Sequence, residues 1–70
     1  MMLEELDVVA LLTNRPDLGL GKGQVGAIVC RLGDGEAYEV EFVDDQGYTY
    51  GMGTFRAEEL LKLHHRAEAA

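Results

Sequence analysis

The segment KGQVGAIVCRL at residues 22–32, the turn GDG at 33–35 and the segment YEVEFV at 38–43 decide the predicted fold. The first segment is apolar and β-branched over the length of a strand, and the last one alternates apolar side chains with glutamates. The Asp-Gly pair between them supplies the positive φ angles of a type I′ turn. We therefore expect an antiparallel hairpin, with Val40 and Phe42 in the core.

One further strand is expected before this hairpin and one after it. Residues 7–12 form a continuous apolar run with β-branched side chains, which favours a buried strand. A helix over residues 2–12 is the alternative. A second turn signal at 44–47 precedes residues 48–54, which we expect to form the fourth strand.

The glycine-rich segment at residues 14–24 is expected to be a wide loop. A phosphate-binding loop needs Gly-Lys followed by Ser or Thr, but here Lys22 is followed by Gly23. A dinucleotide-binding fingerprint needs a helix directly afterwards, and none is expected. In such a loop, glycines adopt the positive φ angles that other residues disfavour.

The C-terminal segment allows two interpretations. Residues 57–60 favour a helical turn, and alternation in residues 61–65 then favours a short fifth strand. Alternatively, residues 57–66 form one continuous helix. We expect residues 1–5 and 67–70 to fray.

Together these elements predict a mainly all-β chain, a small SH3-like barrel of four to five antiparallel strands with one short helical turn near the C-terminus. An open four-stranded meander packed on a C-terminal helix is the alternative. Seventy residues correspond to one domain, covering residues 1–70.

The charge and the single cysteine restrict the class of protein. Six basic and 13 acidic residues give a net charge of −7, which repels phosphate backbones and anionic lipid headgroups. Cys30 has no partner for an internal disulfide. The acidic N-terminus does not resemble a signal peptide, and no apolar run reaches the ~20 residues that span a bilayer. We expect a cytoplasmic protein that does not bind membranes.

The side chains that could bind a metal or take part in catalysis do not combine into a site. The adjacent side chains of His64 and His65 point apart on a strand or a helix, which disfavours a shared metal. Cys30 lies in an apolar strand and is typical of an inert small hydrophobe. The Asp44-Asp45 pair is a turn signal, and the chain contains no serine. We expect no catalytic residues, no cofactor and no metal, and therefore not an enzyme.

The chain resembles a family of short bacterial SH3-like proteins described only as a domain of unknown function. The resemblance rests on ELDVVALL at residues 5–12, GQVGAIV at 23–29 and YEVEFVD at 38–44 with Gly47, and it extends from residue 5 to 63. Arg56 departs from it, because a proline often opens the helical turn there. The resemblance implies a barrel without an established activity, in a gene context similar to toxin–antitoxin or immunity pairs.

The phrase at residues 23–29 also resembles the KOW-type motif of ribosomal and transcription-factor barrels. Those barrels have basic surfaces, whereas the basic residues here are few and scattered, so the phrase indicates a barrel turn rather than RNA binding. Two hypotheses follow: an acidic module that binds, neutralises or regulates a protein partner, and a KOW-like barrel associated with nucleic acid or the ribosome. The charge favours the first.

A candidate partner surface consists of exposed tyrosines and C-terminal leucines. Leu60, Leu61 and Leu63 point in too many directions for one small barrel to cover, which indicates a homodimer in which some of them cross the interface. The candidate residues are Tyr38, Tyr48, Tyr50, Leu60, Leu61 and Leu63.

Overall fold

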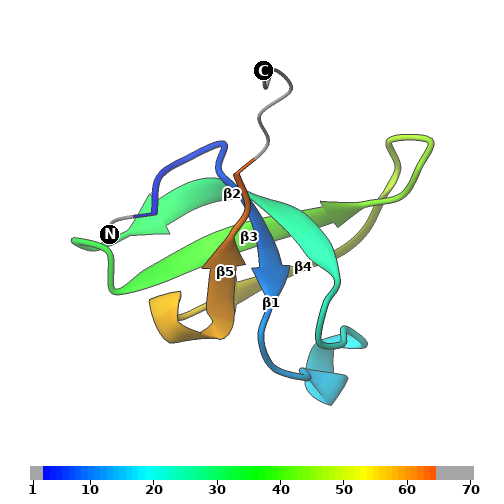
Figure 1. Ribbon diagram of the computed structural model, residues 1–70, viewed down its shortest axis with the longest axis horizontal. Coiled ribbons are helices and arrows are strands. Elements are labelled where there is room, and N and C mark those ends of the chain that lie inside the picture. The colour runs from blue at the N-terminus through cyan, green and yellow to red at the C-terminus, as the bar shows by residue number, and fades with distance from the viewer. Residues whose placement is uncertain (1–2, 65–70) are drawn as a thin grey trace.

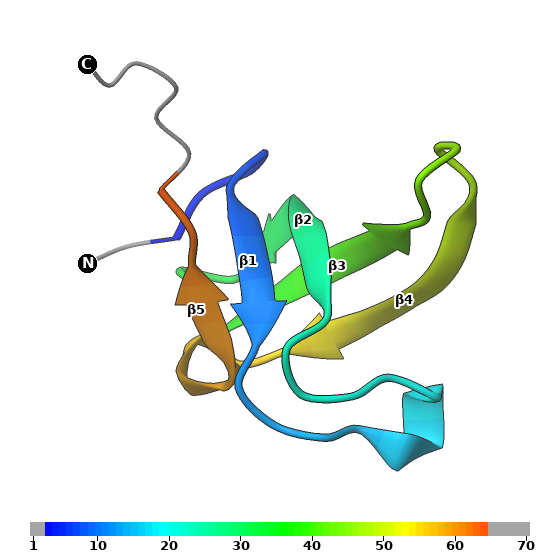
Figure 2. The same ribbon diagram turned by 45° about the vertical axis from the view of Figure 1, so that its right-hand side comes forward.

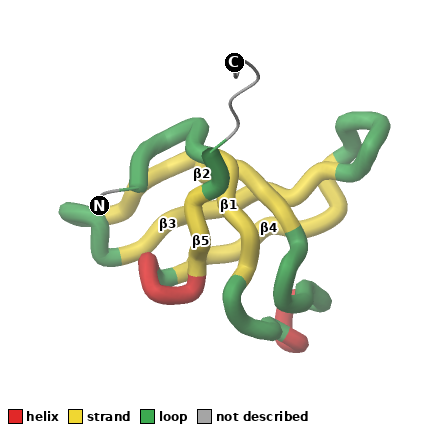
Figure 3. The backbone as a smooth tube through the Cα atoms, viewed as in Figure 1, coloured by secondary structure: helices red, strands yellow, loops and turns green. Residues whose placement is uncertain are grey.

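One antiparallel sheet makes up most of the computed structural model, which describes residues 3–64. Its strands are β1 (Val8–Leu11), β2 (Val25–Leu32), β3 (Ala37–Val43), β4 (Thr49–Phe55) and β5 (Leu60–Lys62), in the spatial order β4-β3-β2-β1-β5 (Figure 1). Two short 3₁₀ turns, η1 (Pro16–Leu18) and η2 (Ala57–Glu59), complete the fold (Figure 3).

The predicted all-β fold with a helical turn before the last strand is confirmed. The alternatives with a helix at residues 2–12 or 57–66 are wrong, because β1 and β5 occupy those segments. The strand expected within residues 22–32 is β2, whereas η1 inside the long loop was not expected.

Strand β2 joins the two halves of the sheet. Its first residues, Val25–Ala27, pair with β1, and the pairing with β3 runs from Ala27, which has a neighbour on both sides, to Leu32. The register shifts between Ile28 and Cys30, and such bulges bend strands. As a result β1 and β5 cross over the β3–β4 hairpin, and the sheet folds over its own core (Figure 2). Among the described strands, no ladder joins β4 to β5.

The core lies between these two halves. Val40 and Phe42 are fully buried, which confirms the face predicted for β3. Leu3 is also buried, which corrects the expectation that residues 1–5 fray as a whole; residues 1–2 and 65–70 lie outside the described part. The core residues are Leu3, Val9, Leu11, Leu20, Ile28, Tyr38, Val40, Phe42, Phe55 and Leu60.

Glycines allow the two halves and the long loop to approach closely. A Cβ atom on Gly26 would lie 2.8 Å from both the Glu41 carbonyl oxygen and the Phe42 ring. A Cβ atom on Gly51 would lie 2.9 Å from the Leu20 side chain, and one on Gly53 would clash with the Leu18 side chain. The bare backbone of β4 is therefore covered by the long loop.

The first hairpin turn differs from the prediction. A type I′ turn at Asp34-Gly35 needs positive φ at both residues, but the positive values are at Gly33 (61°) and Gly35 (93°). The amides of Gly35 and Glu36 both donate to the Leu32 carbonyl, so residues 33–36 form a four-residue turn. The type I′ prediction was wrong because the turn contains a second glycine, which takes the left-handed conformation that Asp34 would have needed.

Candidate interaction surface

The side chains that point away from the core form an apolar surface on the sheet. Successive side chains of a strand point to opposite sides, so the neighbours of buried residues such as Val9, Ile28 and Phe42 face solvent. We define the outer face as Val8 on β1, Val25 and Ala27 on β2, Glu41 and Val43 on β3, and Met52 on β4. Its valines and methionine are each 38–47% exposed.

The strand registers place these side chains next to one another. Val8 pairs with Ala27, Ala27 with Glu41, and Glu41 with Met52, so one row crosses four strands. Val25 and Val43 lie beside this row. Together with Val8, Ala27 and Glu41 of the row, they line a shallow depression between β1, β2 and β3. The sequence analysis did not select this surface, because apolar strand residues are expected inside.

Two glutamates on β3 are held by threonines of β4. The Thr54 hydroxyl donates to Glu39 Oε1 at 2.7 Å, and the Thr49 hydroxyl donates to Glu41 Oε2. Neither carboxylate forms an ion pair within residues 3–64. The outer face therefore combines apolar surface with the oriented charge of Glu41, and Glu39 adds a second one next to it on the same side of β3; neither has a cation partner within residues 3–64.

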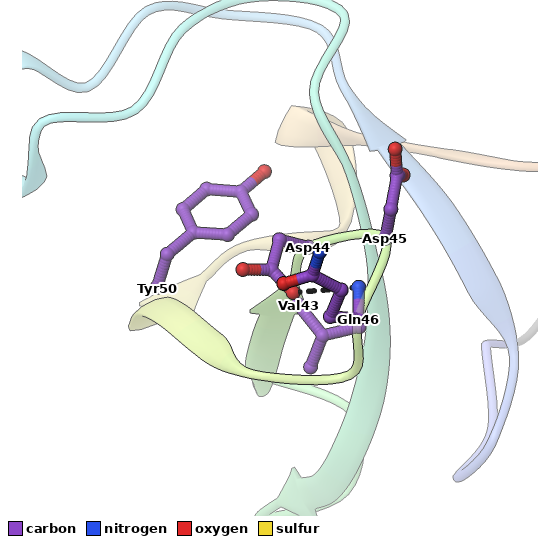
Figure 4. A pocket seen from close by; sticks show the side chains of 5 residues that line it. All are labelled: Val43, Asp44, Asp45, Gln46 and Tyr50. Carbon is purple, nitrogen blue, oxygen red and sulfur yellow. Dashed lines mark hydrogen bonds between the residues drawn. The ribbon is translucent and has the colours of Figure 1, made fainter.

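The β3–β4 turn is built on an aspartate. Asp44 Oδ1 accepts the amides of Gln46 at 2.9 Å and Tyr48 at 3.0 Å, which fits a turn that ends with Gly47 at positive φ (86°). Figure 4 shows the adjoining pocket, with the Tyr50 ring beside Asp44 and Gln46. The Tyr50 hydroxyl accepts a hydrogen bond from Gln24 Nε2 at 3.1 Å, which fixes the ring against the long loop.

Arg15 ties the long loop to the sheet. It donates to both carboxylate oxygens of Asp17, lies 3.5 Å from a Glu59 oxygen and sits 5.0 Å from the centre of the Phe55 ring. The hydrogen bond from Arg15 lowers the pKa of Asp17, and the same bond raises the pKa of Arg15. Because its guanidinium pairs with the carboxylates of Asp17 and Glu59, Arg15 adds little net positive charge to the surface.

The six residues predicted as a partner surface do not lie together. Tyr38 is only 3% exposed, so the expectation that it faces solvent is wrong, and Leu60, at 6%, is a leucine that the chain itself covers. Tyr38 points to the same side of β3 as Val40 and Phe42 and therefore belongs to the core. Tyr48 and Tyr50 are exposed near the β3–β4 turn, and Leu61 is exposed on β5 with the half-buried Leu63 after it.

The described residues offer no set of metal ligands. Within residues 3–64 no three His, Cys, Asp or Glu side chains gather around a common point. Cys30 is a half-buried free thiol, and the predictions about His65 lie outside the described residues. Over the same part of the chain, no helix has the length and apolar character needed to cross a membrane.

The comparison with family models covers all five strands. A model described as a domain of unknown function, DUF4926, matches residues 5–62. The chain belongs to the DUF4926 family. The resemblance to a family of unknown function is thus confirmed, and the description of that family names no activity. No curated protein and no solved structure matches the chain, so the SH3-like and bacterial assignments stay predictions.

Proposed function

We propose that this DUF4926 domain is a non-catalytic, cytoplasmic protein-interaction module that binds a protein partner through its outer face. The observation that carries the proposal is the outer face: a row across four strands that is apolar except for Glu41, with the exposed Val25 and Val43 beside it. Contiguous exposed apolar surface is typical of sites where proteins bind one another. The family resemblance adds that the partner is neutralised or regulated, as in toxin–antitoxin or immunity pairs.

The charge distribution supports a protein rather than a nucleic-acid partner. The net charge is −7, and Arg15, Arg56 and Lys62 are each engaged with carboxylates of the same chain. A nucleic-acid interface needs basic side chains that are available to phosphates. The KOW-like alternative therefore rests on the phrase at residues 23–29 and on the remaining basic side chains, of which Lys22 and Arg31 are exposed.

The proposal is tested by a capture experiment with matched variants. The tagged parent, a Val25→Gln/Val43→Gln variant and a Leu32→Gln control are exposed to lysate of the source organism, and the retained proteins are identified by mass spectrometry. Leu32 lies at the other end of β2, about 23 Å from Val25 along the strand. We expect the parent and the control to retain the same protein, and the double variant to lose it.

The captured protein is then purified, and its affinity for the three chains is measured by calorimetry. Circular dichroism and melting establish that each variant is folded. Equal affinity for all three chains would contradict the proposal, as would salt-sensitive retention of nucleic acid alone.

A further inference from the structure

We infer that the partner segment docking on the outer face is a basic amphipathic helix, whose apolar side packs on the valines and whose Lys or Arg side chains reach Glu39 and Glu41. This inference rests on the proposed function and names the chemistry of the partner. Three features of the described residues lead to it: the apolar row, the two oriented carboxylates and the overall charge.

The apolar part of the surface suits a helix. A sheet with an apolar face is most often covered by a helix, whose apolar stripe matches the row of side chains across the strands. Val8, Val25 and Val43 line the depression between β1, β2 and β3. Gly26 presents only its backbone to this depression, because a side chain at this position would point to the Phe42 ring in the core.

The carboxylates select a basic partner over a neutral or acidic one. Glu41 lies inside the apolar row between Ala27 and Met52, and a helix that covered the row would remove its carboxylate from water. A buried charge without a counter-charge is costly, so an acceptable partner must bring a cation to this position. Glu39, two residues away on the same side of β3, offers a second position for a cation.

The threonines fix where the cations bind. Thr49 and Thr54 each donate to one oxygen of a glutamate, which leaves the second oxygen of each carboxylate without a hydrogen bond within residues 3–64. A charge-assisted hydrogen bond to an oriented carboxylate is stronger than one to a mobile side chain, because less side-chain entropy is lost. The net charge of −7 adds long-range attraction for a basic partner.

The test uses a synthetic peptide of about four helical turns with leucines on one side and lysines on the other. Its affinity is measured by fluorescence anisotropy for the parent, for Glu39→Gln/Glu41→Gln and for Asp34→Asn/Asp45→Asn. Glutamine still accepts the threonine hydrogen bonds, so the first variant removes charge and keeps the fold. The second variant removes the same amount of charge from the two exposed hairpin turns.

We expect the glutamate variant to bind the lysine peptide at least about tenfold more weakly than the parent, and the control no more than about threefold more weakly. A peptide with glutamates in place of lysines should not bind. In NMR titration the amides of Val8, Val25 and Val43 should shift, while residues 33–36 stay unchanged.

Equal losses in both variants would overturn the inference, because the peptide would then follow net charge alone. So would a parent that fails to bind the lysine peptide, or one that binds DNA or RNA at this face instead. If the peptide fails while a captured protein still requires Val25 and Val43, the basic-helix inference falls and the proposed function stands. If the peptide binds through the glutamates and no protein requires the valines, the proposed function falls.

Discussion

Phe42 contacts both halves of the folded sheet. Its ring lies 5.9 Å from the Phe55 ring in an edge-on arrangement and 6.4 Å from the Tyr50 ring, while Gly26 of β2 lies against its edge. Aromatic pairs in this geometry contribute beyond the area that they bury. The side chain therefore joins β2, β3 and β4 at one point.

Replacing Phe42 by alanine should cost about 3–5 kcal/mol of unfolding free energy, since it removes buried surface and leaves a cavity. A chain of this size has little stability to lose, so most of the variant should be unfolded at room temperature. Urea denaturation followed by circular dichroism measures the change. Tyr48→Ala, at a side chain that is 70% exposed, is the control and should denature like the parent.

Gly26 is a position where even one methyl group does not fit. Its added Cβ would approach a backbone oxygen, which cannot move aside as a flexible side chain can. Gly26→Ala should therefore lose about 1–3 kcal/mol. Gly21→Ala is the matched control, because its Cβ would lie at ordinary contact distances of 3.5 and 3.6 Å. Equal melting temperatures for both variants would show that the β2–β3 approach is looser than described.

Individual residues show how far sequence reasoning reaches. The alternation of residues 38–43 is sufficient to place Val40 and Phe42 inside. The same alternation places Tyr38 inside, which contradicts its prediction as an exposed tyrosine. The packing of Leu18 and Leu20 on the glycines of β4 could not be predicted, because the two segments are distant in sequence. The outer face was missed for a related reason: only the register shows which apolar residues remain uncovered.

At the level of elements, the long loop between β1 and β2 is held by few side chains. Leu18 and Leu20 pack on β4, Gln24 bonds to Tyr50, and Arg15 reaches Asp17, Glu59 and the Thr54 carbonyl. The glycines at 19 and 23 have positive φ, as the sequence analysis expected for a wide loop. The loop is thus a cover for β4.

The Arg15–Asp17 pair should make the stability of this loop depend on pH. The pKa of Asp17 is lowered in the folded chain, so the unfolded chain takes up the proton at a higher pH. The stabilisation is complete above the ordinary pKa of an aspartate and is lost as the pH falls through the folded value. Asp17→Asn should lower the melting temperature slightly at neutral pH, and the difference should close in acid. A difference that persists unchanged in acid would contradict this role.

At the level of the whole molecule, strand β5 ends the sheet and leaves one edge without a neighbour in residues 3–64. Exposed edges of this kind pair with other chains. Leu61 projects from β5 and is 49% exposed, while the adjacent Leu60 is buried in the core. The leucine that remains available for a homodimer is therefore Leu61, with Leu63 beside it.

We expect a homodimer that strengthens as salt is added, because two chains of charge −7 repel each other and salt screens the repulsion. Sedimentation equilibrium at several micromolar concentrations, in low and high salt, measures the association. Leu61→Asp should remain monomeric, and Leu32→Gln should behave like the parent. A monomer mass at every concentration and salt level would remove the dimer.

The position of β1 between β2 and β5 governs how quickly the sheet can assemble. Ala10 pairs with Val25 on one side and with Leu61 on the other, and nearly the whole described chain separates the second pair. Closing so long a loop costs conformational entropy before the contacts between β1 and β5 can offset it. The β2–β3 and β3–β4 hairpins, in contrast, pair residues that are close in sequence. Refolding should then take about milliseconds to seconds, and stopped-flow traces completed within microseconds would contradict this order. Until β5 arrives, the second side of β1 has no neighbour and its backbone groups are open to other chains, so the rate of this last pairing sets how long that side of β1 is exposed to aggregation.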